Sequence, residues 1–197
     1  MPPSDQEKSR LRHQLRQRRR QLSASERERA GTAAASYLQQ LPGWPDFSHI
    51  ALYLPIDGEL DTRAIAGACR QIGANLYLPR INGTGTMQLL HWDEHTPLLI
   101  NAYGIAEPAA GARVCHITEL DVLLAPLVGW DKQGNRLGMG GGYYDRMLAK
   151  TQHPPLFIGL AYDFQCMEEG LPVRAWDIQM DGVLTDKGLH IRTADPT

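Results

Sequence analysis

Short apolar runs, each bounded by glycine, proline or polar residues, recur along this chain. Runs of this length are typical of strands buried in a sheet. They predict main strands at residues 49–56, 75–80, 87–92, 122–128 and 156–162, and a short strand at 183–184.

Helical patterns lie between and before these strands, and capping residues mark several of their starts. The first expected helix has Ser4 as its N-cap and carries the apolar stripe Leu11, Leu15 and Leu22, and the second runs from the capping box Ser23–Glu26 to about Gln40. Three more are expected: from Asp61 or Thr62 to Gly73, from Tyr143 to Lys150, and over the short segment 164–169.

Strand and helix alternate between residues 49 and 80, which gives two βα units in series. This order indicates a parallel sheet with helices on its faces. Residues 82–85 are expected to form a hairpin-type turn, residues 93–119 to form loops and short pieces, and the tail after Asp195 to fray.

Length and composition indicate an ordinary globular domain. The chain has 197 residues, of which 43% are hydrophobic and 21% charged, so one domain over residues 1–197 is expected. No apolar run reaches membrane-spanning length, and no signal-peptide stretch begins the chain. The three separated cysteines, Cys69, Cys115 and Cys166, indicate reduced thiols in the cytoplasm.

Most basic residues near the amino terminus, Arg16–Arg20 among them, are expected on a solvated helix face. Lys8 and Arg12 differ because they are four residues apart, share a face and could clamp one anion together. A nucleic-acid interface would need a larger basic surface with stacking aromatic side chains. Since the net charge is −2, we expect neither a nucleic-acid nor a membrane partner.

The segment from Gly129 to Arg146 has the most distinctive chemistry, with glycine at six of its first fourteen positions. It joins an apolar strand to a helical pattern, the layout of a backbone cradle for phosphate. Arg136 can pair with phosphate oxygens, and Asp145 can ligate Mg²⁺. The fingerprints G-x-G-x-x-G and G-x-x-x-x-G-K-[ST] are absent. A flexible surface loop with the following tyrosine pair in the core is therefore the alternative.

Three acidic residues are candidates for ligand contacts. Glu59 follows a buried strand, where ligands of parallel sheets gather, although it could instead serve the dipole of the next helix. Asp181 precedes a short strand and could join Asp145 as a second Mg²⁺ ligand. His91 and His95 are four residues apart, but the local pattern is strand then turn, so we interpret them as ordinary histidines.

The run Arg136-Leu-Gly-Met-Gly-Gly-Gly-Tyr-Tyr-Asp145, preceded by Trp130-Asp-x-x-Gly134, resembles the signature of the 5-formyltetrahydrofolate cyclo-ligase family, also called methenyltetrahydrofolate synthetase. Further matches cover nearly the whole chain: Lys8-x-x-x-Arg12, Leu54-x-x-x-x-Glu59-x-x-Thr62, Leu78-Pro-Arg80, Met87, Asp177 and Asp181–Thr185. The resemblance implies an α/β fold, a three-layer sandwich around a mainly parallel central sheet, in a single domain and as a monomer.

The resemblance also implies an activity: ATP- and Mg²⁺-dependent conversion of 5-formyltetrahydrofolate to 5,10-methenyltetrahydrofolate, giving ADP and phosphate. ATP would be held by Lys8, Arg12, Arg136, Leu137, Gly138, Met139, Gly140, Gly141, Gly142, Tyr143 and Tyr144. The folate would be bordered by Arg12, Leu54, Glu59, Met139, Gly140, Gly141, Gly142 and Tyr143. Asp145 and Asp181 would bind Mg²⁺, and Arg136, Tyr143 and Tyr144 would act in catalysis.

The chain departs from some family members, which carry a lysine in place of Gly141 and an arginine in place of Met139. The phosphate charge would then be met here by Lys8, Arg12, Arg136, Mg²⁺ and the backbone. Transfer of a γ-phosphoryl group to the formyl oxygen requires positioning and charge neutralisation rather than a side-chain nucleophile. Two alternatives stay open: a sugar-phosphate isomerase or CoA-transferase-like protein on a similar sheet, and a nucleic-acid-binding module that uses the first helix.

Overall fold

The apolar runs of the sequence form strands with apolar side chains on both faces. In strand β7 (Val122–Pro126), Val122 and Leu124 pack into one core cluster, whereas Leu123 and Ala125 pack into another. A strand buried on both faces is typical of a parallel sheet covered by helices. The two clusters are the two sides of one sheet.

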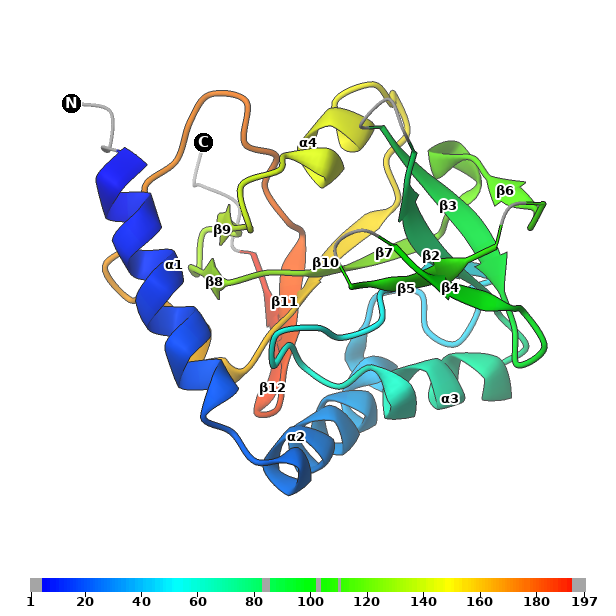
Figure 1. Ribbon diagram of the computed structural model, residues 1–197, viewed down its shortest axis with the longest axis horizontal. Helices are drawn as coiled ribbons and strands as arrows, with labels where there is room; N and C mark the ends of the chain where they lie inside the picture. Colours follow the sequence, from blue (N-terminus) through cyan, green and yellow to red (C-terminus); the bar gives the residue numbers. More distant parts are fainter. Residues whose placement is uncertain (1–4, 83–85, 102–103, 110, 193–197) are drawn as a thin grey trace.

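The structure is a computed structural model that describes residues 5–82, 86–101, 104–109 and 111–192. Within these ranges one eight-stranded sheet has the order β12-β11-β10-β7-β1-β2-β3-β6 (Figure 1). The five strands from β11 to β2 are parallel, and β12, β3 and β6 each join the sheet by an antiparallel pairing, β12 with β11, β3 with β2 and β6 with β3. The remaining strands of this sheet are β1 (His49–Ala51), β2 (Asn75–Ile81), β3 (Met87–Trp92), β6 (Val114–Cys115), β10 (Leu156–Leu160), β11 (Gly182–Thr185) and β12 (Gly188–Ile191). The predicted mainly parallel α/β fold is confirmed.

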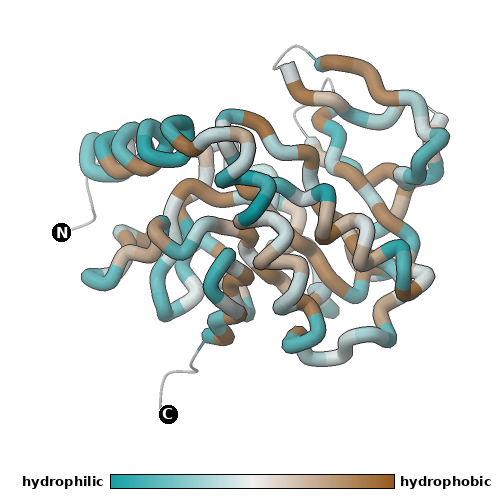
Figure 2. The backbone as a smooth tube through the Cα atoms, turned by 90° about the horizontal axis from the view of Figure 1, so that it is seen from below, coloured by the Kyte–Doolittle hydropathy of each residue, from teal (hydrophilic) through white to brown (hydrophobic). Residues whose placement is uncertain are grey.

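Helices cover both faces of the sheet. On one side lie α2 (Ala24–Ser36) and α3 (Arg63–Gln71), and on the other lies α4 (Tyr143–Leu148) (Figure 1). The capping box of Ser23 and Glu26 forms as predicted. Figure 2 shows apolar residues along the central strands and a mostly hydrophilic α1. Among the described helices, none is long and apolar enough to cross a membrane.

Helix α1 (Asp5–Arg20) lies beside the sheet at the carboxyl ends of the central strands (Figure 1). Its Leu15 packs with Val128 and Leu137 in a separate small cluster. These partners belong to the segment that follows β7, where β8 (Gly129–Trp130) and β9 (Arg136–Leu137) form a hairpin. α1 is therefore docked on the glycine-rich segment rather than on the sheet itself.

Several element boundaries differ from those predicted. β1 ends at Ala51 rather than at residue 56, and Pro55 beyond it has no backbone N–H for a ladder. α2 ends at Ser36 and gives way to the 3₁₀ turn η1 (Leu38–Gln40). Two elements are missing from the prediction, the β8–β9 hairpin and the edge strand β12.

Short elements make up residues 93–119, the segment without hydrophobic periodicity, as predicted. They are β4 (Leu98–Ile100), which pairs with β5 (Ala106–Pro108), then β6 and the 3₁₀ turn η2 (Ile117–Glu119). The helix predicted at 164–169 is the 3₁₀ turn η3 (Asp163–Gln165). The predicted cap Ser4, the turn residues 83–85 and the tail after Asp195 lie outside the described residues.

Two helical glycines give a matched test of packing around α2 and α3. A Cβ on Gly31 of α2 would lie 2.3 Å from the carbonyl oxygen of Asp61, which is backbone and cannot move cheaply. A Cβ on Gly67 of α3 would meet nothing within 4 Å. Gly31→Ala is expected to lower the free energy of unfolding by about 1–3 kcal/mol. Gly67→Ala is expected to raise it by about 0.5–1 kcal/mol.

Urea unfolding of both variants measures these changes. Equal stability of Gly31→Ala and the parent protein would mean that α2 does not approach the start of α3 this closely.

Candidate functional site

A cavity of about 590 Å³ opens at the carboxyl ends of the parallel strands. Pro126 and Leu127 reach it from the end of β7, and Glu59 reaches it from the loop that follows β1. α1 forms one wall, and the glycine segment Gly138–Gly142 with α4 forms another. Four parts of the chain that are distant in sequence thus share one cavity.

The β8–β9 hairpin places the glycine segment. Buried Asp131 accepts hydrogen bonds from the backbone N–H groups of Gln133, Asn135 and Leu171, and so fixes the turn of the hairpin. After β9 the chain runs along the cavity as bare backbone, with φ of +104° at Gly140 and +62° at Gly142. Because these φ values are strained for other residues, glycine is required at both positions.

Two cations of α1 reach the cavity, as the shared-face prediction requires. Lys8 is buried, and its Nζ lies 3.1 Å from Oδ2 of Asp177. Arg12 donates from Nε to the carbonyl of Gly138 at 2.7 Å, which ties α1 to the glycine segment. Both residues line the cavity.

Arg136 lines the cavity but is also a structural residue. Its side chain is only 7% exposed, and it donates to Oδ1 of Asp145 at 2.6 Å and to the carbonyl of Ile178. Its guanidinium lies over the ring of Phe157, 4.7 Å from the centroid. The residue therefore holds α4, the segment before β11 and the sheet together at the cavity wall.

Glu59 is a buried carboxylate that reaches the cavity from the loop after β1. Its Oε2 accepts from the backbone N–H of Ile56, and its Oε1 lies 3.5 Å from the guanidinium of Arg19. Burial raises the pKa of Glu59 to about 7, although Arg19 opposes that rise. Since Asp61, not Glu59, accepts from the first N–H of α3, the helix-dipole interpretation of Glu59 is not supported.

The two tyrosines of α4 have different surroundings. Tyr144 packs against the core cluster on its side of the sheet, and burial together with the Glu59 carboxylate raises its pKa. Tyr143 lies against Gly141, where a Cβ would come within 2.6 Å of its ring. Both rings also line the cavity, so core packing and cavity lining are not exclusive here.

Most of the predicted site residues are brought together, but two are not among the residues that line the cavity. Leu54 packs against the core on the α2–α3 side. Asp181 accepts from the backbone N–H of Phe157 at 2.8 Å, at the amino end of β11. The predicted pairing of Asp145 and Asp181 around one Mg²⁺ is thus not formed across the cavity, and it stays a prediction.

The solvated-face interpretation is wrong for one arginine of α1. Arg19 is fully buried, whereas Arg20 is 56% exposed. Arg16, Arg19 and Arg20 all pair with the single carboxylate of Asp57. Asp57 therefore offsets part of the positive charge of this run.

Comparison with known proteins agrees with this geometry. A sequence model of the 5-formyltetrahydrofolate cyclo-ligase family matches residues 4–186. The chain belongs to this family. The cyclo-ligase of Escherichia coli K12 is 38% identical over 87% of this chain and 96% of its own length. That of Haemophilus influenzae is 36% identical over 91% of this chain and 97% of its own.

Solved structures give the same result. The 5,10-methenyltetrahydrofolate synthetase of Aquifex aeolicus has a TM-score of 0.82 at 34% identity, covering 96% of this chain and 95% of its own. The synthetase of Mycoplasma pneumoniae has a TM-score of 0.74 at 26% identity, covering 91% and 98%. Family membership makes the chain a cyclo-ligase, an enzyme of folate one-carbon metabolism.

Eight further lining residues were not predicted as site residues. They are Asp5, Pro126, Leu127, Arg146, Ala149, Arg174, Trp176 and Asp177. Asp177 belongs to a segment that carries the family resemblance, and Trp176 before it is 65% exposed. A tryptophan next to a matched aspartate was the available signal in the sequence for this irregular segment.

Arg136 and Arg146 give a test of the cavity wall. Arg136→Ala removes a buried pair with Asp145 and the stacking on Phe157, and is expected to lower the free energy of unfolding by about 3 kcal/mol. Arg146 lies in the same wall but is exposed, so Arg146→Ala should cost less than about 1 kcal/mol. Urea unfolding measures both, and equal losses would contradict the structural role of Arg136.

Proposed function

We propose that this cavity binds ATP and 5-formyltetrahydrofolate side by side and that the chain joins them in an ATP- and Mg²⁺-dependent ring closure. The observation that carries the proposal is that one cavity is lined both by cations beside a glycine-rich backbone and by a buried carboxylate, Glu59, from a different part of the chain.

The part of the cavity around these cations is the proposed ATP half. Lys8 and Arg12 project from α1 toward the glycine segment. Its backbone N–H groups can approach phosphate oxygens closely because positions 138 and 140–142 carry no side chains. Arg136 stands at the start of this segment and adds a third cation.

The part of the cavity around Glu59 is the proposed folate half. A carboxylate repels ATP phosphates but accepts hydrogen bonds from the N–H groups of a pterin ring. Glu59 supplies that acceptor, and the ring of Tyr144 lies near it. Tyr143 stands between the two halves, beside Gly141.

Asp145 is the residue best placed to hold Mg²⁺. Its Oδ1 pairs with Arg136 and the N–H of Ile178, while the carboxylate faces the cavity. Among the described residues no three acidic, histidine or cysteine side chains form a metal-binding group. This agrees with Mg²⁺ held by one or two carboxylates and by substrate phosphates. When bound, the ion would neutralise charge on the transferred phosphoryl group.

The reaction balances without a covalent enzyme intermediate. The formyl oxygen attacks the γ-phosphorus of ATP, ADP leaves, and an iminium phosphate forms. The second folate nitrogen then attacks the formyl carbon, its proton is released and phosphate leaves, which closes the ring of 5,10-methenyltetrahydrofolate. Lys8, Arg12 and Arg136 hold the phosphates in line, and Tyr143 and Tyr144 border the formyl group, which is the positioning that phosphoryl transfer requires.

The direct experiment mixes the protein with MgATP and 5-formyltetrahydrofolate and follows the absorbance of methenyltetrahydrofolate. Product is expected only when ATP and Mg²⁺ are both present, with one ADP released for each ring closed. Ring closure that proceeds equally well without ATP would overturn the proposal.

Glu59→Gln tests the folate half. The change keeps the shape of the side chain and removes its charge. The KM for 5-formyltetrahydrofolate should therefore rise, by a factor that corresponds to a loss of about 1.5–3 kcal/mol in binding free energy. ATP affinity measured without folate should barely change. In the parent enzyme, kcat/KM for folate should fall as the pH drops through about 7, because Glu59 then takes up a proton; this limb should vanish in Glu59→Gln.

Lys8→Ala is the matched variant in the ATP half of the cavity. It should weaken ATP binding and leave folate binding largely unchanged. If Glu59→Gln weakens ATP alone, the assignment of the two halves is wrong.

Asp145→Asn tests the proposed role of Asp145 as a Mg²⁺ ligand. Asparagine retains an oxygen that accepts from Arg136 and Ile178, so folding should survive while the Mg²⁺ concentration needed for half-maximal turnover rises. Titration of turnover with Mg²⁺ measures this, and Asp181→Asn in parallel tests the second predicted ligand. An unchanged Mg²⁺ requirement in both variants would remove these aspartates from the metal site.

A further inference from the structure

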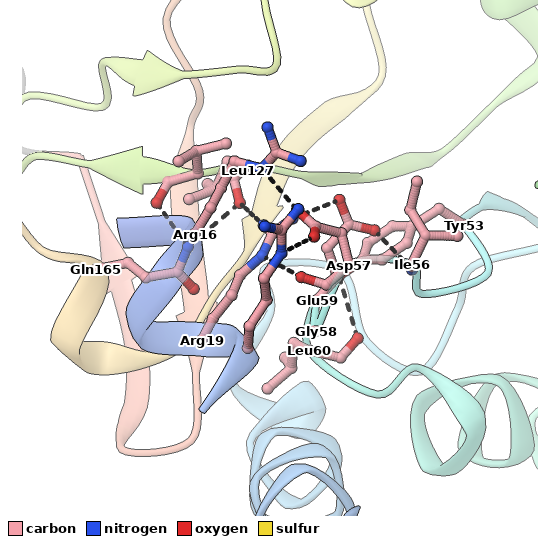
Figure 3. A network of polar contacts seen from close by, with 12 residues as sticks. Arg16, Arg19, Tyr53, Ile56, Asp57, Gly58, Glu59, Leu60, Leu127 and Gln165 are labelled. Carbon is pink, nitrogen blue, oxygen red and sulfur yellow. Dashed lines mark hydrogen bonds and ion pairs between the residues drawn. The ribbon is translucent and has the colours of Figure 1, made fainter. Parts of the chain in front are cut away.

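Arg19 is a buried cation that the proposed reaction does not use. It has no exposed surface, and all three of its nitrogens are engaged (Figure 3). A buried guanidinium needs a structural or functional reason, because removing its charge from water costs several kcal/mol. Its partners show what that reason is.

Those partners belong to two segments that border the cavity. Nε donates to the carbonyl of Asp57 at 2.8 Å, and Nη1 donates to the carbonyl of Leu127 at 3.1 Å. Nη2 lies 3.0 Å from Oδ2 of Asp57 and 3.5 Å from Oε1 of Glu59. Figure 3 shows the guanidinium lying between these groups. One side chain therefore joins α1 to the loop after β1 and to the end of β7.

The loop that carries Glu59 has little freedom around this contact. Asp57 and Gly58 have φ of +52° and +75°, and a Cβ on Gly58 would lie 2.9 Å from the carbonyl oxygen of Arg19. The hydroxyl of Tyr162 donates to the carbonyls of Gly58 and Glu59. α1 and this loop are thus fitted to each other at backbone level, and the Arg19 side chain completes the fit.

We propose that Arg19 is the positioning residue of the folate half of the site, holding Glu59 in place as a charged acceptor for the substrate. This inference rests on the proposed function, since it presumes that Glu59 binds the folate. Arg19 itself does not line the cavity, so it acts through Glu59 rather than on the substrate.

The electrostatic surroundings of Glu59 support this role. Arg19 and, more weakly, Arg16 face it from α1, Asp57 faces it from its own loop, and Tyr53 and Tyr144 lie near it. Burial and Asp57 favour the protonated carboxyl, and the arginines oppose them. Loss of Arg19 should therefore move protonation of Glu59 to higher pH and leave less of the charged acceptor at neutral pH.

The test is a double-mutant cycle of Arg19→Gln and Glu59→Gln in the full chain, with 5-formyltetrahydrofolate and ATP as probes. Arg19→Gln should raise the folate KM about tenfold and change the ATP KM less than twofold. In Arg19→Gln, the fall of kcat/KM for folate toward low pH should begin at a higher pH than in the parent enzyme. In the Glu59→Gln background the same change should have little further effect on the folate KM.

Two variants separate this role from a merely structural one. Arg19→Lys keeps the charge and should recover most of the folate KM and the parent pH profile; it also serves if Arg19→Gln does not fold. Arg20→Gln is the control from the same run, since Arg20 pairs with Asp57 from the exposed side without a contact to Glu59. It should leave the folate KM and the pH profile unchanged.

The outcomes distinguish failure of this inference from failure of the proposed function. If Glu59→Gln leaves the folate KM unchanged, the assignment of Glu59 is wrong and the inference falls with it. If Glu59→Gln raises the folate KM but Arg19→Gln does not, only the role of Arg19 is overturned. Equal effects of Arg19→Gln in both backgrounds, or on both substrates, would make Arg19 a general scaffold residue.

Discussion

The burial of one guanidinium sets the geometry at the carboxyl edge of this sheet. Arg19 enters the protein between two strand ends and takes its partners from both, the carbonyls of Asp57 and Leu127 and the carboxylates of Asp57 and Glu59. A buried cation is stable only when its donors are satisfied, so these contacts fix the carboxyl-terminal end of α1 against the two strand ends. Lys8 and Arg12, about three and two turns away along α1, have separate anchors in Asp177 and in the carbonyl of Gly138.

The charges of the cavity are arranged as ion pairs, which the proposed binding of a nucleotide would have to rearrange. Lys8 pairs with Asp177, Arg136 with Asp145 and Arg174 with Asp5, so each of these cations is held by a carboxylate. Arg12 differs, since among the described residues its hydrogen bond goes to the neutral carbonyl of Gly138. It can meet an incoming phosphate without losing an ion pair. Displacement of Arg136 toward phosphate would free Asp145 for a divalent cation, so the two proposed events favour each other.

The sequence predicts the sheet and the glycine cradle well because both depend on local patterns. Apolar runs mark the strands, and the capping box marks the start of α2. The β8–β9 hairpin escapes prediction because its strands have two residues each and are held by the buried Asp131. Leu54 was predicted as a site residue from a motif match, and Asp181 from its place before a short strand and from a motif match. Such matches place a residue in the chain but do not fix where its side chain points.

Arg19 shows how the helical period could have been used further. Lys8, Arg12, Leu15 and Arg19 follow one another at intervals of four, three and four residues, so they form one stripe along α1. Lys8 and Arg12, the pair predicted to clamp an anion, therefore already marked the inward face of α1. Arg19 lies farther along the same face. The six arginines of α1 look alike by composition, but only Arg19, on the continuation of this stripe, is buried. Periodicity, applied to charged residues as it is to apolar ones, separates a solvated cation from one that organises a site.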